Sequence, residues 1–357
     1  MSYTNGLDNP ELFFQCKLYT GTGSSHAITL DGSEDMQPDM VWWKERTSTD
    51  YHTIVDSVRG ATKRIFPNAT DAEDTNTESL KSFDSDGFTM GTNAGANQAS
   101  QPYVAWNWKA GTSFSNDASA TGVGDIDSSG SVNTDAGISI CSFTGNGSNS
   151  QTVKHGLSTA PELIILKARG QGTYGWMTYD SVNGAGKYMN FAADHGAVSD
   201  TGMWSNTAPT SSVFSLSNGG NTAITNPNTV TMIAYCFHSV KSYSKISSFT
   251  GNGNADGTFV YTGFRPAWVI IKKSSGTNEW GVWDNKRSTS NVTDDIIYAN
   301  LSNAEAANNA NGLDFVSNGF KIRASGDLFN ASGGTYIYMA FAESPFTNSN
   351  GVPTNAR

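Results

Sequence analysis

The chain repeats itself three times, and this repeat constrains the fold more than any other feature. In each copy, an aromatic–Thr–Gly–x–Gly segment precedes a proline-led apolar strand, a segment that ends in aspartate and a closing strand rich in aromatic residues. The proline-led strands read PDMVWWKER, PELIILKAR and PAWVIIKKS, and they begin at Pro38, Pro161 and Pro266. Each unit therefore spans about 100 residues, which is too long for a solenoid repeat.

Units of this length can each bury a core, and their sequence pattern is that of strands. The closing segment from Tyr336 to Phe341 alternates aromatic and smaller apolar residues, and Asn-Gly pairs separate the apolar runs. We therefore predict an all-β protein made of three tandem concanavalin-like or jelly-roll β-sandwich domains, with little helix. The expected domains are residues 1–110, 137–243 and 244–346, with a polar linker at 111–136 and a C-terminal arm at 347–357.

Composition excludes several classes of function. A net charge of −10 argues against nucleic acid as a partner, because phosphate binding needs a basic surface. The longest apolar runs, such as 163–166, are too short to cross a bilayer, so we predict no membrane insertion. Cys16, Cys141 and Cys236 stand in apolar runs without the spacing of a disulfide framework or a metal site, and we expect them to be buried. No cofactor is expected.

A lysine and an aspartate recur in every unit, on consecutive predicted strands. Residues that face each other across two strands can form an ion pair at the strand ends. A catalytic pair is rarely kept in triplicate, whereas a folding element is copied with its fold. We therefore predict that these residues are structural pairs with no catalytic role, namely Lys44 with Asp56, Lys167 with Asp180, and Lys272 with Asp284.

Other polar motifs give weaker indications of chemistry. Asp125, Asp127 and Ser129 match the start of a calcium-binding loop, but Ala136 stands where the bidentate glutamate is expected. We treat them as a weak calcium candidate, with a polar turn as the alternative. Acidic residues that could serve a glycosidase fall in polar loops without apolar framing, so we expect no catalytic residues; they are Asp71, Glu73, Asp74, Glu78, Asp294 and Asp295.

Four aromatic residues lie outside or beside the recurrent strands: Tyr51, Tyr174, Trp204 and Tyr243. Aromatic faces beside Asn, Asp and Ser are what a sugar-binding surface needs, since the ring stacks and the polar groups bond the hydroxyls. The alternative is that these rings close the open ends of the sandwiches. They are our candidate binding residues for a host-surface glycan.

The recurring phrases, taken together, resemble a domain found in marine phage proteins. These phrases are FTGNG, the His155-Gly156-Leu157 segment, the strand APELIILK, the joint SSGSVNTDAGISI and the closing YIYMAFAESPF. A largely uncharacterised repeat domain with such phrases occurs in tail-fibre-like and other virion proteins of cyanophages and pelagiphages. The resemblance extends from about Phe13 to Phe346. It implies a concanavalin-like or jelly-roll sandwich and a place on the phage particle, and it supplies no catalytic residues.

We accordingly expect a non-enzymatic protein exposed on the virion surface, either a tail-fibre or receptor-binding protein or a capsid decoration or fibre. The expected partners are other proteins of the capsid or tail and a host cell-surface glycan. A glycan-degrading depolymerase on the same scaffold is the alternative. Because a single sandwich binds sugars weakly, we expect a homo-oligomer, a trimer in particular. The tryptophan-rich first unit has more aromatic residues than one small core needs, so we expect it to attach the protein to the virion.

Overall fold

The computed structural model describes residues 7–307 and 309–354. Strands take up 41% of the chain and helices 7%, so the prediction of an all-β protein is confirmed. The helices of the described residues are single turns on connections: η1 (Pro10–Leu12), α1 (Ala94–Asn97), α2 (Ala118–Thr121), η2 (Gly219–Asn221), α3 (Thr222–Thr225), η3 (Asn309–Asn311) and α4 (Asp327–Asn330). None of them is long and apolar enough to cross a membrane.

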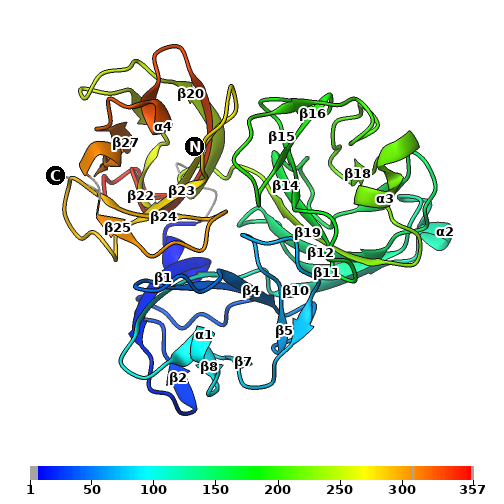
Figure 1. The fold of residues 1–357 in the computed structure, drawn as a ribbon, viewed down its shortest axis with the longest axis horizontal. Helices are drawn as coiled ribbons and strands as arrows, with labels where there is room; N and C mark the ends of the chain where they lie inside the picture. The colour runs from blue at the N-terminus through cyan, green and yellow to red at the C-terminus, as the bar shows by residue number, and fades with distance from the viewer. Residues whose placement is uncertain (1–6, 308, 355–357) are drawn as a thin grey trace.

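The strands form three units that lie around a common centre (Figure 1). Every unit has a larger and a smaller antiparallel sheet. The first unit has a sheet of order β1 (Phe14–Thr20), β9 (Pro102–Trp108), β3 (Met40–Glu45), β4 (Thr53–Asp56) and a second of order β2 (His26–Ile28), β8 (Gly87–Met90), β7 (Leu80–Asp84). A short ribbon joins β5 (Lys63–Arg64) to β6 (Asp74–Thr75).

The second unit has the largest sheet. Its order is β10 (Thr112–Asn116), β11 (Ser128–Asn133), β12 (Ile138–Thr144), β19 (Thr231–Phe237), β14 (Leu163–Ala168), β15 (Met177–Asp180), β16 (Lys187–Asn190), β17 (Val198–Ser199). Its smaller sheet pairs β13 (Thr152–Lys154) with β18 (Val213–Ser215).

The third unit has a larger sheet of order β20 (Ser244–Thr250), β28 (Thr335–Pro345), β22 (Phe264–Lys273), β23 (Gly281–Asp284), β24 (Asp295–Tyr298), β25 (Ala306–Ala307). Its smaller sheet has the order β21 (Phe259–Tyr261), β27 (Gly319–Ile322), β26 (Leu313–Val316). Each of the three larger sheets contains four neighbouring strands in one common order: first strand, closing strand, proline-led strand, aspartate strand.

The prediction of a linker at 111–136 is wrong. Residues 112–116 and 128–133 form β10 and β11, which extend the sheet of the second unit beyond β12. The segment has few large apolar residues because one face of these strands carries serines, and Ser115 is paired with Ser129. On the other face, Val132 is buried in the core of the second unit and Phe114 packs against it.

Each unit has its own core between its two sheets. In the first unit, Val41 and Trp43 of β3 pack with Phe88 of β8, and the second and third units bury corresponding residues. Alternate residues of a strand point to opposite faces, so Met40 and Trp42 point away from this core. These outward faces are buried as well.

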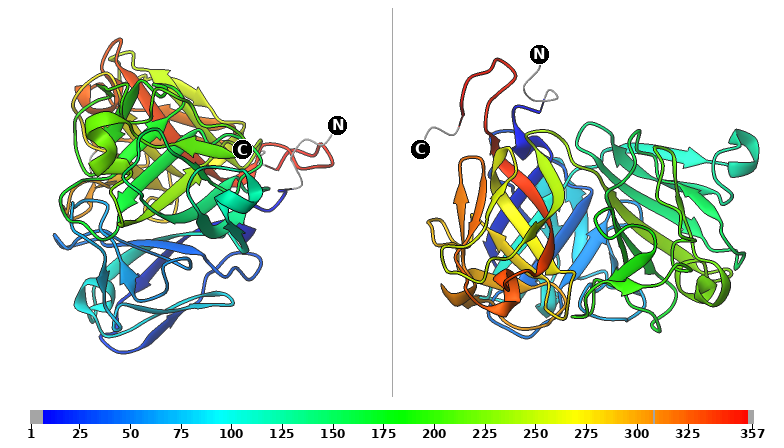
Figure 2. Two further views of the ribbon diagram at one scale, coloured as in Figure 1. Left: turned by 90° about the vertical axis from the view of Figure 1, so that its right-hand side faces the viewer. Right: turned by 90° about the horizontal axis from the view of Figure 1, so that it is seen from above.

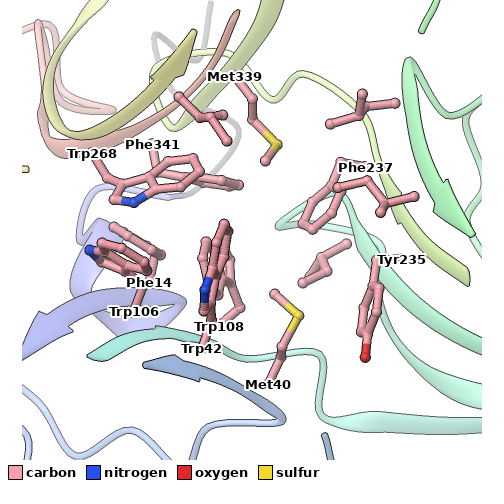
Figure 3. Close-up of a cluster of buried hydrophobic side chains, with 14 of the residues drawn as sticks. Phe14, Met40, Trp42, Trp106, Trp108, Tyr235, Phe237, Trp268, Met339 and Phe341 are labelled. Atoms are coloured by element: carbon pink, nitrogen blue, oxygen red, sulfur yellow. The ribbon is translucent and has the colours of Figure 1, made fainter. Parts of the chain in front are cut away.

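A fourth core fills the centre of the molecule, where the outward faces of the three larger sheets meet (Figure 3). Phe14 of the first unit stacks on Phe341 of the third with ring centroids 5.0 Å apart, and Trp108 meets Trp268 edge-on at 5.6 Å. Phe237 of the second unit contacts Phe341 at 6.2 Å. Figure 2 shows the same arrangement from two further sides, with the second unit in front of the third on the left and the first unit behind the other two on the right.

The expectation that the first unit offers spare aromatic residues for attachment is therefore wrong. Trp42, Trp106 and Trp108 are buried in the central core, and Trp43 is buried in the core of the first unit. The apparent excess of aromatic residues in the first unit is thus its contribution to the central core. By contrast, Cys16, Cys141 and Cys236 are free and buried, as expected.

Because the three units share the central core, a substitution in this core should destabilise more than the unit that carries it. We expect Trp268→Ala to lower the free energy of unfolding by about 4 kcal/mol. It should also speed amide exchange in β3 and β9 of the first unit, because the Trp268 ring contacts Trp42, Trp106 and Trp108.

The matched control is Trp283→Ala, which removes an equally buried indole from the third unit's own core. Its effect on local exchange should stay within the third unit. Hydrogen exchange followed by mass spectrometry measures both variants, and identical exchange patterns would contradict a shared core.

Candidate functional site

The recurrent lysines and aspartates do not form the predicted pairs. Met40, at the start of β3, is the residue opposite Asp56, whereas Lys44 lies near the other end of that strand. Because the two strands are antiparallel, Lys44 lies at the loop end of β3 and Asp56 at the far end of β4, so a constant separation along the chain does not bring the two residues together. Each lysine Nζ instead donates to backbone carbonyls: Lys44 to Glu45 and Ser48 at 2.6 and 2.7 Å, Lys167 to Thr70 and Tyr174 at 2.7 and 2.8 Å, and Lys272 to Asp194 and Lys273 at 2.8 and 3.0 Å.

Two of these lysines join neighbouring units, since Thr70 belongs to the first unit and Asp194 to the second. All three are fully buried. Burial lowers the pKa of each from 10.5 to about 8, while nearby acidic groups oppose the shift. The lysines therefore donate to carbonyl groups, and the prediction that they pair with the recurrent aspartates is wrong.

Two of the three aspartates, Asp56 and Asp284, bind an arginine of their own unit and a donor on an aromatic side chain of the next unit. Asp56 accepts from Arg59 Nε at 2.5 Å and from the Tyr235 hydroxyl of the second unit at 2.6 Å. Asp284 accepts in the same way from Arg287 Nε at 2.6 Å and from Trp106 Nε1 of the first unit at 3.0 Å. These carboxylates are buried at the interfaces between units, so they stabilise the assembly of the chain.

A glutamate completes each of these two interfaces by bridging two arginines. Glu73 contacts Arg59 at 3.2 Å and Arg169 of the second unit at 2.8 Å. Glu305 contacts Arg287 at 3.0 Å and Arg46 of the first unit at 2.6 Å. The glutamate backbone N–H also donates to the carbonyl of that second arginine, at 2.8 and 2.7 Å.

The interface between the second and third units keeps the backbone contact and lacks the arginine–glutamate pairs. Ala197 stands in the place of the glutamate and Ser274 in that of the second arginine, and the Ala197 N–H donates to the Ser274 carbonyl at 2.8 Å. Asn183 replaces the arginine beside Asp180 and donates to both carboxylate oxygens at 2.9 Å. The two arginines and the glutamate are thus replaced together at this interface, while the aspartate is kept.

A ring N–H crosses every interface at a third equivalent position, four residues before the aspartate. Each ring donates to a carbonyl of the neighbouring unit: His52 Nε2 to Tyr298 at 3.2 Å, Trp176 Nε1 to Phe66 at 2.9 Å, and Trp280 Nε1 to Asn190 at 3.3 Å. Burial lowers the pKa of His52, which keeps this ring neutral. Its Nδ1 accepts from Trp42 Nε1 at 3.0 Å, so Nε2 carries the proton.

The weak calcium candidate lies beside an open groove of about 620 Å³ along β10, β11 and β12. Asp125 accepts from the backbone N–H and hydroxyl of Thr152 at 2.8 and 2.6 Å, and Asp127 accepts from the Ala118 N–H at 2.8 Å. Ser129 is a strand residue of β11. No group of three or more acidic, histidine or cysteine side chains suited to a metal occurs within 7–307 and 309–354. The two carboxylates hold turns in place.

The four aromatic candidates divide evenly between core and surface. Trp204 and Tyr243 are 1% and 0% exposed, so their assignment as binding residues is wrong: Trp204 packs edge-on against Tyr179 and Tyr243 against Phe341. Tyr51 is 48% exposed and lies beside Phe66 at the edge of the first unit. Tyr174 is half-buried and lines a shallow groove with Pro227 and Asn228.

An exposed aromatic pair on β21 was missed from the sequence. Phe259 and Tyr261 are 47% and 62% exposed, whereas Val260 between them is buried in the third unit. The signal was present in the run FVYTGF, where aromatic residues alternate with a β-branched one. Lys321 stands opposite Phe259 on the neighbouring strand and forms an ion pair with Asp256.

The ionic and neutral interfaces should respond differently to loss of the aspartate charge. We expect Asp284→Asn to cost about 3 kcal/mol, because the buried Arg287 loses its nearest counter-charge. Asp180→Asn should cost only about 1 kcal/mol, because its partner Asn183 is neutral. Urea unfolding at pH 7 measures both, and equal losses would show that the charge at this position does not matter.

The buried lysines should make the protein more stable in mild alkali. In the unfolded chain a lysine keeps its pKa of 10.5, while in the folded protein that of Lys167 is about 8. Between these values the unfolded chain binds more protons, so the free energy of unfolding rises with pH. We expect Lys167→Met to lower this slope by up to about 1.4 kcal/mol per pH unit.

Urea unfolding of both proteins at pH 8.0, 8.75 and 9.5 measures the slopes. The variant is expected to be less stable at every pH, because three carbonyls lose a donor. The slope, and not the offset, is therefore the test. Parallel curves for the two proteins would contradict a lowered lysine pKa.

Comparison with known proteins gives one match. A family model described as "Domain of unknown function (DUF7483)" matches residues 9–345. No curated protein and no solved structure matches the chain. The matched segment contains all three units, both ionic interfaces and the aromatic pair on β21. The chain therefore belongs to the DUF7483 family.

Proposed function

We propose that this chain is a non-enzymatic structural protein on the surface of a phage particle, where it binds a glycan of the host cell. The observation that carries the binding function is the exposed pair Phe259 and Tyr261, with Lys321 and Asp256 beside it. Aromatic faces next to hydrogen-bonding groups are the elements of a carbohydrate-binding surface. The resemblance of the repeated phrases to marine phage proteins supports the virion location, with other capsid or tail proteins as partners.

The positions of the acidic residues favour binding over hydrolysis. Glycoside hydrolysis needs two carboxyl groups that face each other across a substrate-sized cleft. Glu73 is bound to two arginines at an interface, Asp74 is paired with Arg64, and Asp295 accepts from the Ser288 hydroxyl at 2.9 Å. These carboxylates already have structural partners, which supports a protein without catalytic residues.

The architecture and assembly follow from the same proposal. The strand order common to the three larger sheets supports three tandem concanavalin-like or jelly-roll domains. A trimer of the chain, held on a larger virion scaffold, would raise the strength of weak glycan contacts. The surface that attaches it lies outside the tryptophan cluster, because those indoles are buried.

Binding without turnover is the direct test of function. The purified chain should sediment with host-surface polysaccharide and release no new reducing ends over many hours. Release of reducing ends would instead identify a depolymerase, and failure to sediment with any host polysaccharide would contradict glycan binding.

Location and assembly are tested separately. Antibody labelling of intact particles, viewed by electron microscopy, should mark the outer surface and show whether the protein sits on the head or the tail. Light scattering of the purified chain should give three times the monomer mass. Unlabelled particles would contradict the virion location, and a monomer both in solution and on the particle would contradict the trimer.

A further inference from the structure

The outer face of the smaller sheet in the third unit carries aromatic side chains that no element within residues 7–307 and 309–354 covers. The sheet has the order β21, β27, β26, with β21 at its edge. Its inner face buries Val260 and Phe320 in the core of the third unit. Phe259 and Tyr261 point the other way because alternate residues of a strand face opposite sides. Two large rings therefore lie in a row on the surface, about 7 Å apart along the strand.

Glycines next to both rings let them lie close to the backbone. Gly319 is the cross-strand partner of Tyr261, and a Cβ atom added there would clash with the Val260 carbonyl oxygen and lie 3.2 Å from Cε2 of Phe259. A Cβ on Gly263, which has a φ of +86°, would lie 3.6 Å from the Tyr261 hydroxyl. No side chain at these two positions therefore separates the rings from the backbone.

Charged groups next to the rings supply hydrogen-bond donors and acceptors. Lys321, directly opposite Phe259, forms an ion pair with Asp256, whose side chain is 77% exposed. Arg323 is 40% exposed and donates to Asp314 at 2.5 Å. An ammonium, a guanidinium and accessible carboxylate oxygens therefore border an apolar surface. This combination fits a ligand with apolar faces and hydroxyl edges better than a purely apolar protein segment.

The aromatic pair is specific to the third unit. The cross-strand registers place Ala27 of the first unit and Thr152 of the second at the position of Phe259, and Lys154 of the second unit at the position of Tyr261. The residue between them stays apolar and buried in all three units, as Ile28, Val153 and Val260. The fold requires the middle residue and not the flanking aromatic ones. Phe259 and Tyr261 are therefore surplus to folding.

We propose that Phe259 and Tyr261 bind two adjoining pyranose rings of a polysaccharide, which stack on the two aromatic faces while Lys321 and Asp256 bond their hydroxyl groups. This assignment rests on the proposed glycan-binding function and gives it a location. Stacking buries the C–H face of a sugar against an aromatic ring, and the polar groups at the edge select the orientation. The site occurs once per chain.

The first experiment measures binding to purified host-surface polysaccharide and to cellohexaose, chitohexaose and maltohexaose by isothermal titration calorimetry. The variants are Phe259→Ala, Tyr261→Ala, the double variant and Tyr261→Phe. The matched control is Val182→Ala, which removes an exposed apolar side chain from the second unit. We expect Phe259→Ala and Tyr261→Ala each to weaken binding about tenfold and the double variant to abolish it. Val182→Ala should bind like the wild type, and Tyr261→Phe, which keeps the ring, should bind more tightly than Tyr261→Ala.

The outcomes separate this assignment from the broader function. If the wild type binds and the double variant binds equally well, the site lies elsewhere, although the glycan-binding function stands. If the wild type binds none of the four probes, both proposals fail. If the double variant keeps its glycan affinity but no longer joins particles, the face is a contact with a virion protein, and the assignment is overturned.

Chemical modification gives a second readout that does not depend on the variants. Tyr261 is accessible to nitration by tetranitromethane, as is Tyr51. A saturating amount of the tightest-binding probe should lower nitration of Tyr261 severalfold, as measured by peptide mass spectrometry. Equal nitration of Tyr261 with and without bound glycan would overturn the assignment.

Discussion

A β-sheet that is apolar on both faces is stable only if both faces are removed from water, and the rest of the structure depends on this requirement. In each unit one face of the larger sheet packs against a smaller sheet, and the other packs against its counterparts in the two neighbouring units. No unit can bury its second face alone. The three units therefore behave as one folding body, although each has a core of its own.

The polar contacts between units follow the same threefold arrangement, with one exception. Backbone pairs and ring N–H donors recur at every interface, because they depend on the path of the chain. The arginine–glutamate networks occur at two interfaces, and the third has Asn183, Ala197 and Ser274 in their places. A buried charge without its partner is costly, so the arginines and the glutamate are replaced together, while Asn183 donates to the remaining Asp180.

How far the sequence predicted this structure depends on which contacts a residue makes. The repeat predicted strands, and the unbroken apolar run from Met40 to Trp43 indicates a strand that is apolar on both faces. That pattern does not indicate that the second face packs against other units. The sequence therefore favoured a role for the tryptophans of the first unit in attachment to the virion. Serine-rich edge strands such as β10 were taken for a linker because their exposed face contributes no apolar residues.

The site residues show the same division between local and distant contacts. Lys44 and Asp56 were expected to pair because their separation along the chain is constant, yet each finds its partners in loops and in neighbouring units. Those contacts depend on packing that spacing does not reveal. Phe259 and Tyr261 could have been found, because comparison of the three units at the same strand position shows aromatic residues in only one of them.

Covalent linkage of the three units has a consequence for how surfaces can change. In a ring of three identical chains, one substitution appears at three places. A surface residue that disturbs a contact at any one of them is therefore selected against at all three. Here the units are joined in one chain, and Phe259 can differ from Ala27 and Thr152 while the buried residues beside them stay apolar. The ring can therefore keep two units as scaffold and let the outer face of the third evolve independently.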